Sequence, residues 1–119
     1  DMDKAFATMA KHLRQGAPAY VITANPEALH RPHAFFSNSL PAPVTTLAGG
    51  TPYAVVLRAS NGQTLAQVTD YFWPPAEIED AAAKTGLTLE GISHVADPLC
   101  GPQTPPSDYP YRIYSFRRP

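Results

Sequence analysis

One stretch of the sequence, residues 63–95, constrains the fold more than any other. Its first part, 63–71, has the alternating pattern of a strand and leads into the aromatic run Tyr71–Trp73. The pair Pro74-Pro75 follows. Proline cannot continue a strand ladder, but it suits the first turn of a helix, where the backbone N–H groups have no partner. We therefore predict a strand, an aromatic corner and a helix, in that order.

The second part of this stretch has the signals of a helix, its end and a further strand. From Ile78 to Thr85, residues recur at i, i+3, i+4 and i+7, which places them on one helical face. Gly86 stands where a left-handed residue commonly ends a helix, and 87–95 then has the pattern of a strand. A strand that follows a helix of this length is typical of a crossover unit in a parallel sheet, so the sequence predicts an α/β fold.

Two further elements precede this stretch. Apolar residues recur at i, i+4, i+7 and i+11 from Met2 to Leu13, which predicts an amphipathic helix. The run 19–24, AYVITA, is apolar and partly β-branched, and this pattern predicts a strand buried on both faces. The proline-rich segment 25–52 is expected to be an ordered loop with one short helical turn near Glu27.

A hairpin and a final strand complete the set of predicted elements. The turn signal Ser60-Asn61-Gly62 predicts that 53–59 and 63–71 pair as an antiparallel hairpin. The last strand is expected at 111–116. No internal repeat or domain boundary interrupts the sequence, so we expect residues 1–119 to form a single α/β unit.

Composition excludes several classes of function. The net charge of -1 gives no electrostatic reason to expect nucleic acid or an anionic membrane as a partner. The single cysteine, Cys100, excludes an intrachain disulfide and fits a reducing compartment. No apolar run approaches the roughly 20 residues of a membrane span, and the N-terminus has no signal-peptide pattern. We therefore expect a cytoplasmic protein.

The order of the elements predicts the order of three strands in the sheet. If 19–24 and 87–95 run parallel through a right-handed crossover, both end at the same edge of the sheet. The final strand, 111–116, follows 87–95 through a loop without a helix, so it should run antiparallel. We expect it to lie between the other two strands.

This topology brings three irregular segments to one edge of the sheet, namely 25–52, 70–75 and 96–110. In open α/β sheets, ligands bind outside the carboxyl ends of the strands. We therefore expect a site at this edge. Six residues are candidates for binding a substrate there: Asn25, Phe35, Phe36, Tyr71, Phe72 and Trp73.

Each of these candidates also has a purely structural interpretation. Asn25 can simply form a turn, and aromatic side chains can anchor the core. His30 and His33, in the sequence HRPH, are candidate general bases, because histidine is the usual proton acceptor near neutral pH. They can equally be solvated loop residues, and two histidines without further ligands do not predict a metal site.

Three segments resemble the C-terminal half of a class I S-adenosylmethionine-dependent methyltransferase. AFATMAKHLRQGAPAYVITANP (5–26) is similar to that family's helix and fifth strand. TDYFWPPAEIEDAAAKTGLTLEGISHV (69–95) is similar to its aromatic-Pro-x-Glu helix and sixth strand, and PYRIYSFRRP (110–119) to its antiparallel seventh strand. The resemblance implies a partial Rossmann-like sheet with strand order 5-7-6 and an inserted antiparallel β-hairpin.

The resemblance also implies what the chain lacks. The family binds its cofactor with a Gly-rich turn and an acidic residue on its first strands, and this chain has no G-x-G. We therefore expect a fragment whose N-terminal cofactor-binding half is absent, and which does not bind S-adenosylmethionine alone. The 19–24 strand would then have a bare edge, which favours pairing with the missing half or with a second copy.

Two functions follow from these observations. The first is the substrate-side portion of a methyltransferase that acts on a small-molecule oxygen or nitrogen, with S-adenosylmethionine as cofactor in the complete enzyme. The second is a non-enzymatic α/β binding or scaffold module that holds a partner along its exposed strand edge. A hydrolase or a dinucleotide-dependent oxidoreductase is less well supported, because neither G-x-S-x-G nor G-x-G-x-x-G is present. The sequence does not identify the methyl acceptor.

Overall fold

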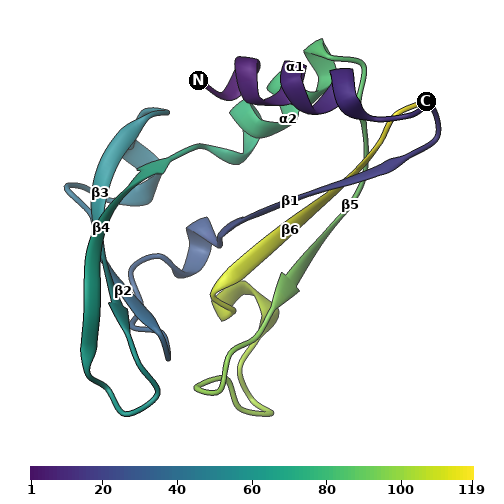
Figure 1. The fold of residues 1–119 in the computed structure, drawn as a ribbon. Coiled ribbons are helices and arrows are strands. Elements are labelled where there is room, and N and C mark those ends of the chain that lie inside the picture. The colour runs from purple at the N-terminus through teal and green to yellow at the C-terminus, as the bar shows by residue number, and fades with distance from the viewer.

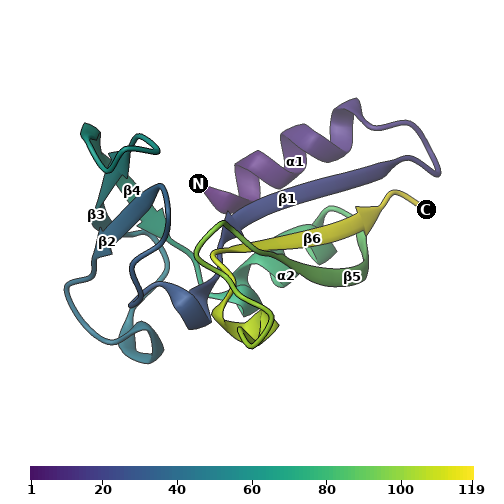
Figure 2. The ribbon, with the colours of Figure 1, turned by 90° about the horizontal axis from the view of Figure 1, so that it is seen from below.

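The computed structural model describes residues 1–119 as two helices and two antiparallel sheets of three strands each (Figure 1). The two sheets lie side by side, as Figure 2 also shows, and the segments that follow the first and fourth strands join them. The elements are α1 (Met2–His12), β1 (Pro18–Ala24), β2 (Phe36–Ser39), β3 (Thr51–Arg58), β4 (Thr64–Phe72), α2 (Pro75–Lys84), β5 (Thr88–Val95) and β6 (Tyr111–Arg117). Neither helix is long and apolar enough to span a lipid bilayer.

The first sheet has the strand order β1-β6-β5. β6 pairs antiparallel with both neighbours, so β1 and β5 run parallel to each other. The final strand of the chain therefore lies in the middle, as predicted from its loop-only connection to β5. β1 is an edge strand, and one side of it has no strand partner within the chain.

Both helices pack on the same face of this sheet. Phe6 of α1 meets Phe116 of β6 edge to face, with ring centroids 5.5 Å apart. Ile78 of α2 belongs to the same buried cluster, together with Ala19 and Tyr114. Alternation along β6 places Tyr114 and Phe116 on one face, and Ala19 lies opposite Phe116 in the register. The apolar stripes of α1 and α2 thus form one core with this face.

The opposite face of β1 corrects one expectation from the sequence. The 19–24 strand was predicted to be buried on both faces, but Tyr20 and Ile22 are 64% and 66% exposed. The prediction was wrong because α1 and α2 both cover the Ala19 face, so no element of the chain remains for the other side. An apolar run shows that a strand favours burial, but it does not show that this chain supplies both layers.

The second sheet has the order β2-β3-β4 and contains the predicted hairpin. β3 and β4 pair antiparallel around the turn at residues 59–63. β2 was not predicted, because FSNS is short and polar and lies inside the segment expected to be a loop. Within that segment, the expected helical turn is a 3₁₀ helix at Pro26–Ala28. Phe36, Tyr53, Val55 and Phe72 on the inner face of the sheet form a second apolar cluster with Leu29, which follows the 3₁₀ helix.

The aromatic corner leads into α2 as the sequence predicted. Pro74 occupies the N-cap position without a capping hydrogen bond, Pro75 is the first helical residue, and Gly86 lies just beyond the C-cap Thr85 with a φ of +78°. A side chain at Gly86 would be strained by this left-handed backbone. Because the end of β4 and the start of α2 are only a few residues apart, Trp73 is held between the two sheets.

Candidate functional site

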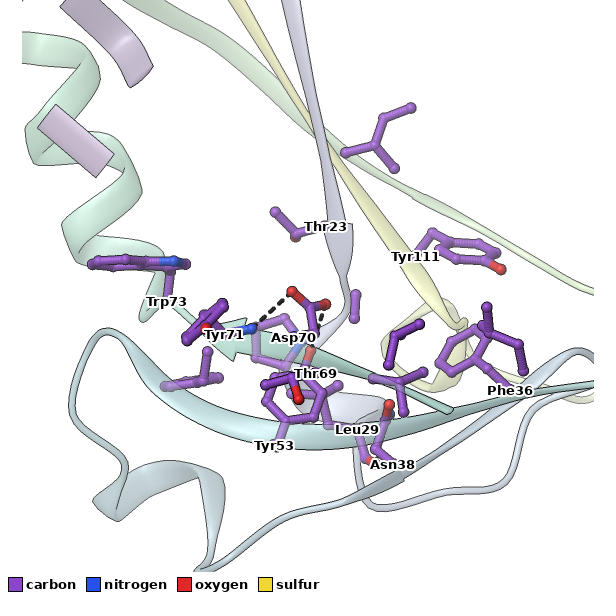
Figure 3. Close-up of a pocket in the computed structure, with 17 residues that line it drawn as sticks. Thr23, Leu29, Phe36, Asn38, Tyr53, Thr69, Asp70, Tyr71, Trp73 and Tyr111 are labelled. Carbon is purple, nitrogen blue, oxygen red and sulfur yellow. Dashed lines mark hydrogen bonds between the residues drawn. The ribbon is translucent and has the colours of Figure 1, made fainter. Parts of the chain in front are cut away.

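A cavity of about 610 Å³ lies between the carboxyl end of β1 and the inner face of the second sheet (Figure 3). Both sheets contribute to its wall, and most of the residues that line it are apolar. The lining residues are Ile22, Thr23, Ala24, Pro26, Leu29, Phe36, Asn38, Tyr53, Val55, Leu57, Val68, Thr69, Asp70, Tyr71, Phe72, Trp73 and Tyr111. The cavity therefore lies where the topology predicted a site, at the end of a strand and beside the aromatic corner.

Four of the six predicted substrate-binding residues line this cavity, namely Phe36, Tyr71, Phe72 and Trp73. Trp73 forms one side of it, as Figure 3 shows, and Gly50 of the loop before β3 packs beside its ring. Phe36 and Phe72 also belong to the second apolar cluster, so they serve the core and the cavity together. Core and pocket roles were both expected for the aromatic residues, and Phe36 and Phe72 combine them.

The other two predicted residues, Asn25 and Phe35, are not part of the cavity wall. Asn25 is completely buried. Its Nδ2 donates hydrogen bonds to the carbonyl oxygens of Ser107 (3.0 Å) and Tyr109 (2.9 Å), and its Oδ1 accepts one from the amide of Glu27. Asn25 therefore holds the end of β1 to the loop that precedes β6. Phe35 is 41% exposed.

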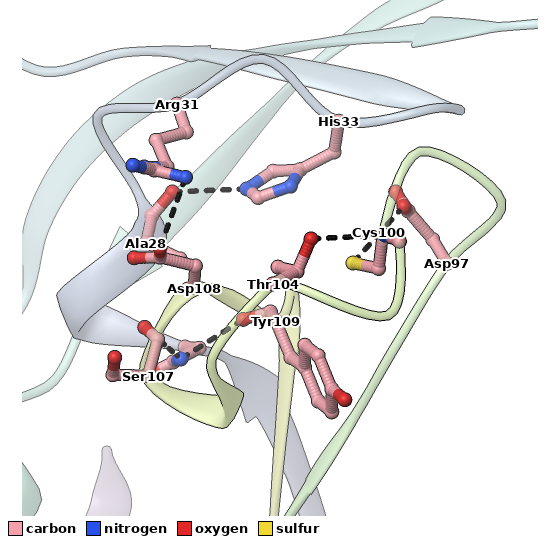
Figure 4. Close-up of polar contacts among 11 residues, drawn as sticks. Ala28, Arg31, His33, Asp97, Cys100, Thr104, Ser107, Asp108 and Tyr109 are labelled. Atoms are coloured by element: carbon pink, nitrogen blue, oxygen red, sulfur yellow. Dashed lines mark hydrogen bonds and ion pairs between the residues drawn. The ribbon is translucent and has the colours of Figure 1, made fainter.

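The two candidate histidines are not brought to the cavity either. His33 is buried, and its Nε2 lies 2.9 Å from the carbonyl oxygen of Ala28 (Figure 4). Its ring packs on Phe36, with centroids 4.7 Å apart. His30 is exposed and borders a separate hollow with Leu40 and Val44. No group of three or more metal-ligating side chains gathers anywhere in the chain. A catalytic role for either histidine remains a prediction.

Asp97 joins two of the irregular segments behind the cavity. Its Oδ2 accepts a hydrogen bond from the amide of Ala34 (2.8 Å), and its Oδ1 accepts one from the amide of Leu99 (2.9 Å) and the thiol of Cys100 (3.5 Å). Burial acts to raise the pKa of this carboxyl, but these hydrogen bonds outweigh it, and the pKa lies below its ordinary value. An ion pair between Arg31 and Asp108 links the same segments. The expected approach of 96–110 to 25–52 is confirmed.

Tyr53 and Asp70 also line the cavity, and neither was among the predicted substrate-binding residues. The hydroxyl of Tyr53 donates a hydrogen bond of 3.1 Å to Oδ2 of Asp70, and the amide of Tyr71 donates one of 2.8 Å to Oδ1. Burial, followed by the charge and the hydrogen bond of Asp70, raises the pKa of Tyr53, so its hydroxyl remains a proton donor. Tyr53 lies opposite Asp70 because the register shifts by one residue between Arg58 and Leu57, and the turn signal alone does not show this shift.

Comparison with known proteins places the fold. No protein family model matches the chain, and no curated protein matches its sequence. Two solved structures share its fold: the CcbJ methyltransferase from Streptomyces caelestis, at 17% identity and a TM-score of 0.50, and an S-adenosylmethionine-dependent methyltransferase from Clostridium acetobutylicum ATCC 824, at 10% identity and a TM-score of 0.54. Each alignment covers 98% of this chain and 52% of the other, so this chain spans about half the length of those proteins. The chain thus has a methyltransferase-like α/β fold.

Proposed function

We propose that this chain forms the substrate-side portion of an S-adenosylmethionine-dependent methyltransferase that acts on a small-molecule oxygen or nitrogen. The supporting observation is the cavity at the carboxyl end of β1, in a chain whose fold matches two methyltransferases. In this proposal β1, β6 and β5 correspond to the fifth, seventh and sixth strands of the family's sheet. The chain is the C-terminal half of the domain.

The cavity residues would bind and orient the methyl acceptor. Trp73, Phe36 and Tyr111 offer flat apolar surfaces, and Asp70 offers a hydrogen-bond acceptor. Methyl transfer depends mainly on proximity and alignment of the two reactants, which suits a site without a conspicuous acid–base pair. The proposal assigns no general base, because Nε2 of His33 is already engaged with Ala28 and His30 lies outside the cavity.

The residues of this chain do not fit S-adenosylmethionine by themselves. The cofactor carries a carboxylate, an ammonium group and a ribose, and the family resemblance assigns their contacts to a Gly-rich turn and a separate acidic residue. The glycines with left-handed backbone here are Gly16, Gly50, Gly62 and Gly86, and none lines the cavity. Asp70 is the only carboxylate in the wall. We infer that a part of the complete enzyme outside this chain holds the cofactor.

The free edge of β1 is the proposed place for that part. Ile22, Thr23 and Ala24 lie on this edge strand and also line the cavity. A strand added beside β1 would satisfy its unpaired backbone groups and extend the cavity wall at the same time. The partner is either the N-terminal half of the same enzyme or a second copy of this chain paired along residues 19–24.

One observation favours the alternative, a non-enzymatic binding or scaffold module. All residues of β4 except Phe72 are exposed, and this strand is the edge of the second sheet. Two open three-stranded sheets leave four edge strands, β1, β5, β2 and β4, and a protein that holds partners by strand addition needs no cofactor.

The sequence that precedes Asp1 in the coding gene discriminates between the two functions. A methyltransferase requires a strand followed by a Gly-rich turn upstream, and the protein that contains it should bind S-adenosylmethionine in a calorimetric titration. A coding sequence without such a turn, or a complete protein that does not bind the cofactor, would refute the methyltransferase proposal. The scaffold alternative would then stand.

A further inference from the structure

The cavity has one charged residue in an otherwise uncharged wall. None of its 17 lining residues is lysine, arginine, histidine or glutamate, and Asp70 is the single acidic residue among them. The remaining polar side-chain groups are hydroxyls, the amide of Asn38 and the indole N–H of Trp73, which are neutral near pH 7. Any ligand in this cavity therefore meets one negative charge and no positive one.

Asp70 forms no ion pair with a cationic side chain of this chain. The donors to its two oxygens are the Tyr53 hydroxyl and the Tyr71 amide, both of which are neutral. Asp70 takes part in none of the four ion pairs of the chain, which join Arg31 to Asp108, Lys84 to Asp3, Arg112 to Glu27 and Arg117 to Glu90. The two hydrogen bonds orient the carboxylate but leave its charge available to a cation.

The walls around this carboxylate are suited to a cation as well. Aromatic rings from both sheets and from the corner before α2 line the cavity, and Figure 3 shows Trp73 and Tyr111 on opposite sides of Asp70. The faces of aromatic rings attract an ammonium group by a cation–π interaction.

We propose that this cavity binds an amine, that is, a small ligand with an aromatic or aliphatic body and a protonated amino group that contacts Asp70. The apolar body lies against the aromatic walls, and the amino group lies at the carboxylate. The role of this amine as the methyl acceptor rests on the function proposed above. The binding of the amine does not rest on that function, because binding needs only the cavity of this chain.

Three probes of similar shape and different charge test the proposal on this chain. We expect 2-phenylethylamine to bind more tightly than neutral 2-phenylethanol, and 3-phenylpropionate to bind most weakly, as measured by NMR chemical-shift titration. The preference for the amine should weaken as salt is added, because Asp70 is exposed enough to be screened. The shifts should appear at the amides of Tyr53, Asp70 and Trp73.

The variant Asp70→Asn removes the charge but keeps an acceptor for Tyr53. It should lower the affinity for the amine roughly two- to fivefold, the range of a partly exposed ion pair, and leave the affinity for 2-phenylethanol unchanged. Asp80→Asn is the matched control, because Asp80 is an exposed carboxylate on α2 outside the cavity wall. It removes the same charge and should change neither affinity.

Each other outcome overturns the proposal. Equal affinities for the amine and the alcohol in the unmodified chain, no binding of any probe, or the same loss in both variants would each exclude a specific contact with Asp70. If Asp70→Asn does not fold, the comparison of the three probes in the unmodified chain still tests whether the cavity prefers an amine. If the amine binds but the complete protein transfers no methyl group, the methyltransferase proposal fails and the amine site stands.

Discussion

The side-chain amide of Asn25 donates a hydrogen bond of 2.9 Å to the carbonyl oxygen of Tyr109, which lies 84 residues further along the chain. The bond joins the carboxyl end of β1 to the segment that enters β6, and the backbone amide of Asn25 bonds the carbonyl of Pro110 beside it. One residue thus fixes the relative position of two strands that both border the cavity. Asn25 was predicted to bind a substrate, but it is completely buried and does not line the cavity.

We expect Asn25→Ala to lower the free energy of unfolding by about 2–4 kcal/mol. The substitution leaves the carbonyls of Ser107 and Tyr109 without these donors, and a buried acceptor that loses its partner costs about 1–3 kcal/mol. Urea unfolding measures the change. Asn61→Ala, at an exposed turn where the side chain accepts from the amide of Gln63, is the control and should cost less than about 0.5 kcal/mol. Equal losses of unfolding free energy in both variants would contradict the structural role of Asn25.

The lowered pKa of Asp97 predicts a loss of stability in acid. The folded-state pKa lies below the unfolded value, so the ionised carboxylate stabilises the fold above the unfolded pKa, and this contribution is lost as the pH falls through the folded pKa. Asp97→Asn should lower the melting temperature at pH 7. The difference in melting temperature between the variant and the unmodified chain should become smaller as the pH approaches 3. At neutral pH we expect a cost on the order of 1 kcal/mol. A difference that is constant from pH 7 to pH 3 would count against this role.

Trp73→Ala should weaken substrate binding in the complete enzyme and also lower the melting temperature. Trp73 lines the cavity and packs against the larger buried cluster. Truncating a fully buried aromatic side chain to alanine costs roughly 3–5 kcal/mol of stability. Because Trp73 is only partly buried, the loss of binding free energy and the loss of folding free energy together should stay below that range. Trp73→Phe should keep most of the affinity. A large fall in melting temperature with unchanged affinity would make Trp73 a core residue alone.

This chain by itself should not bind S-adenosylmethionine at micromolar concentration, and it should associate with itself. The association follows from the unpaired edge of β1 and the exposed side chains of Tyr20 and Ile22. Ile22→Lys should increase the monomer fraction in light scattering, because lysine disfavours pairing at a strand edge. Leu99→Lys is the control, since Leu99 is equally exposed in a distant loop. A monodisperse monomer of 12.9 kDa that binds the cofactor would refute this prediction.

The elements that local signals specify were predicted from the sequence. The turn at Asn61-Gly62 defined the hairpin, the pair Pro74-Pro75 and Gly86 bounded α2, and the loop after β5 placed the last strand in the middle. The strand β2 was missed because its pairing with β3 depends on a partner rather than on its own four residues.

The site was predicted less completely, for a related reason. The site was expected in the irregular segments, whereas Tyr53 reaches the cavity from the face of the hairpin; Asp70 lies in the expected segment 70–75 but was not among the predicted binding residues. His33 was selected by residue type, but its contacts with Ala28 and Phe36 are decided by how the loop folds back. The aromatic corner was placed correctly, because strand and helix signals on either side of it set its position.

The three residues Ile22, Thr23 and Ala24 belong to a strand edge and to a cavity wall at once. Any chain that pairs with β1 would therefore border the cavity, so its binding and the binding of a ligand there can be thermodynamically coupled. If the partner changes the affinity for the ligand by some factor, the ligand must change the affinity for the partner by the same factor. A small molecule in this cavity would then either strengthen or weaken the association between the chain and its partner. The dissociation of the assembly would therefore depend on the ligand concentration.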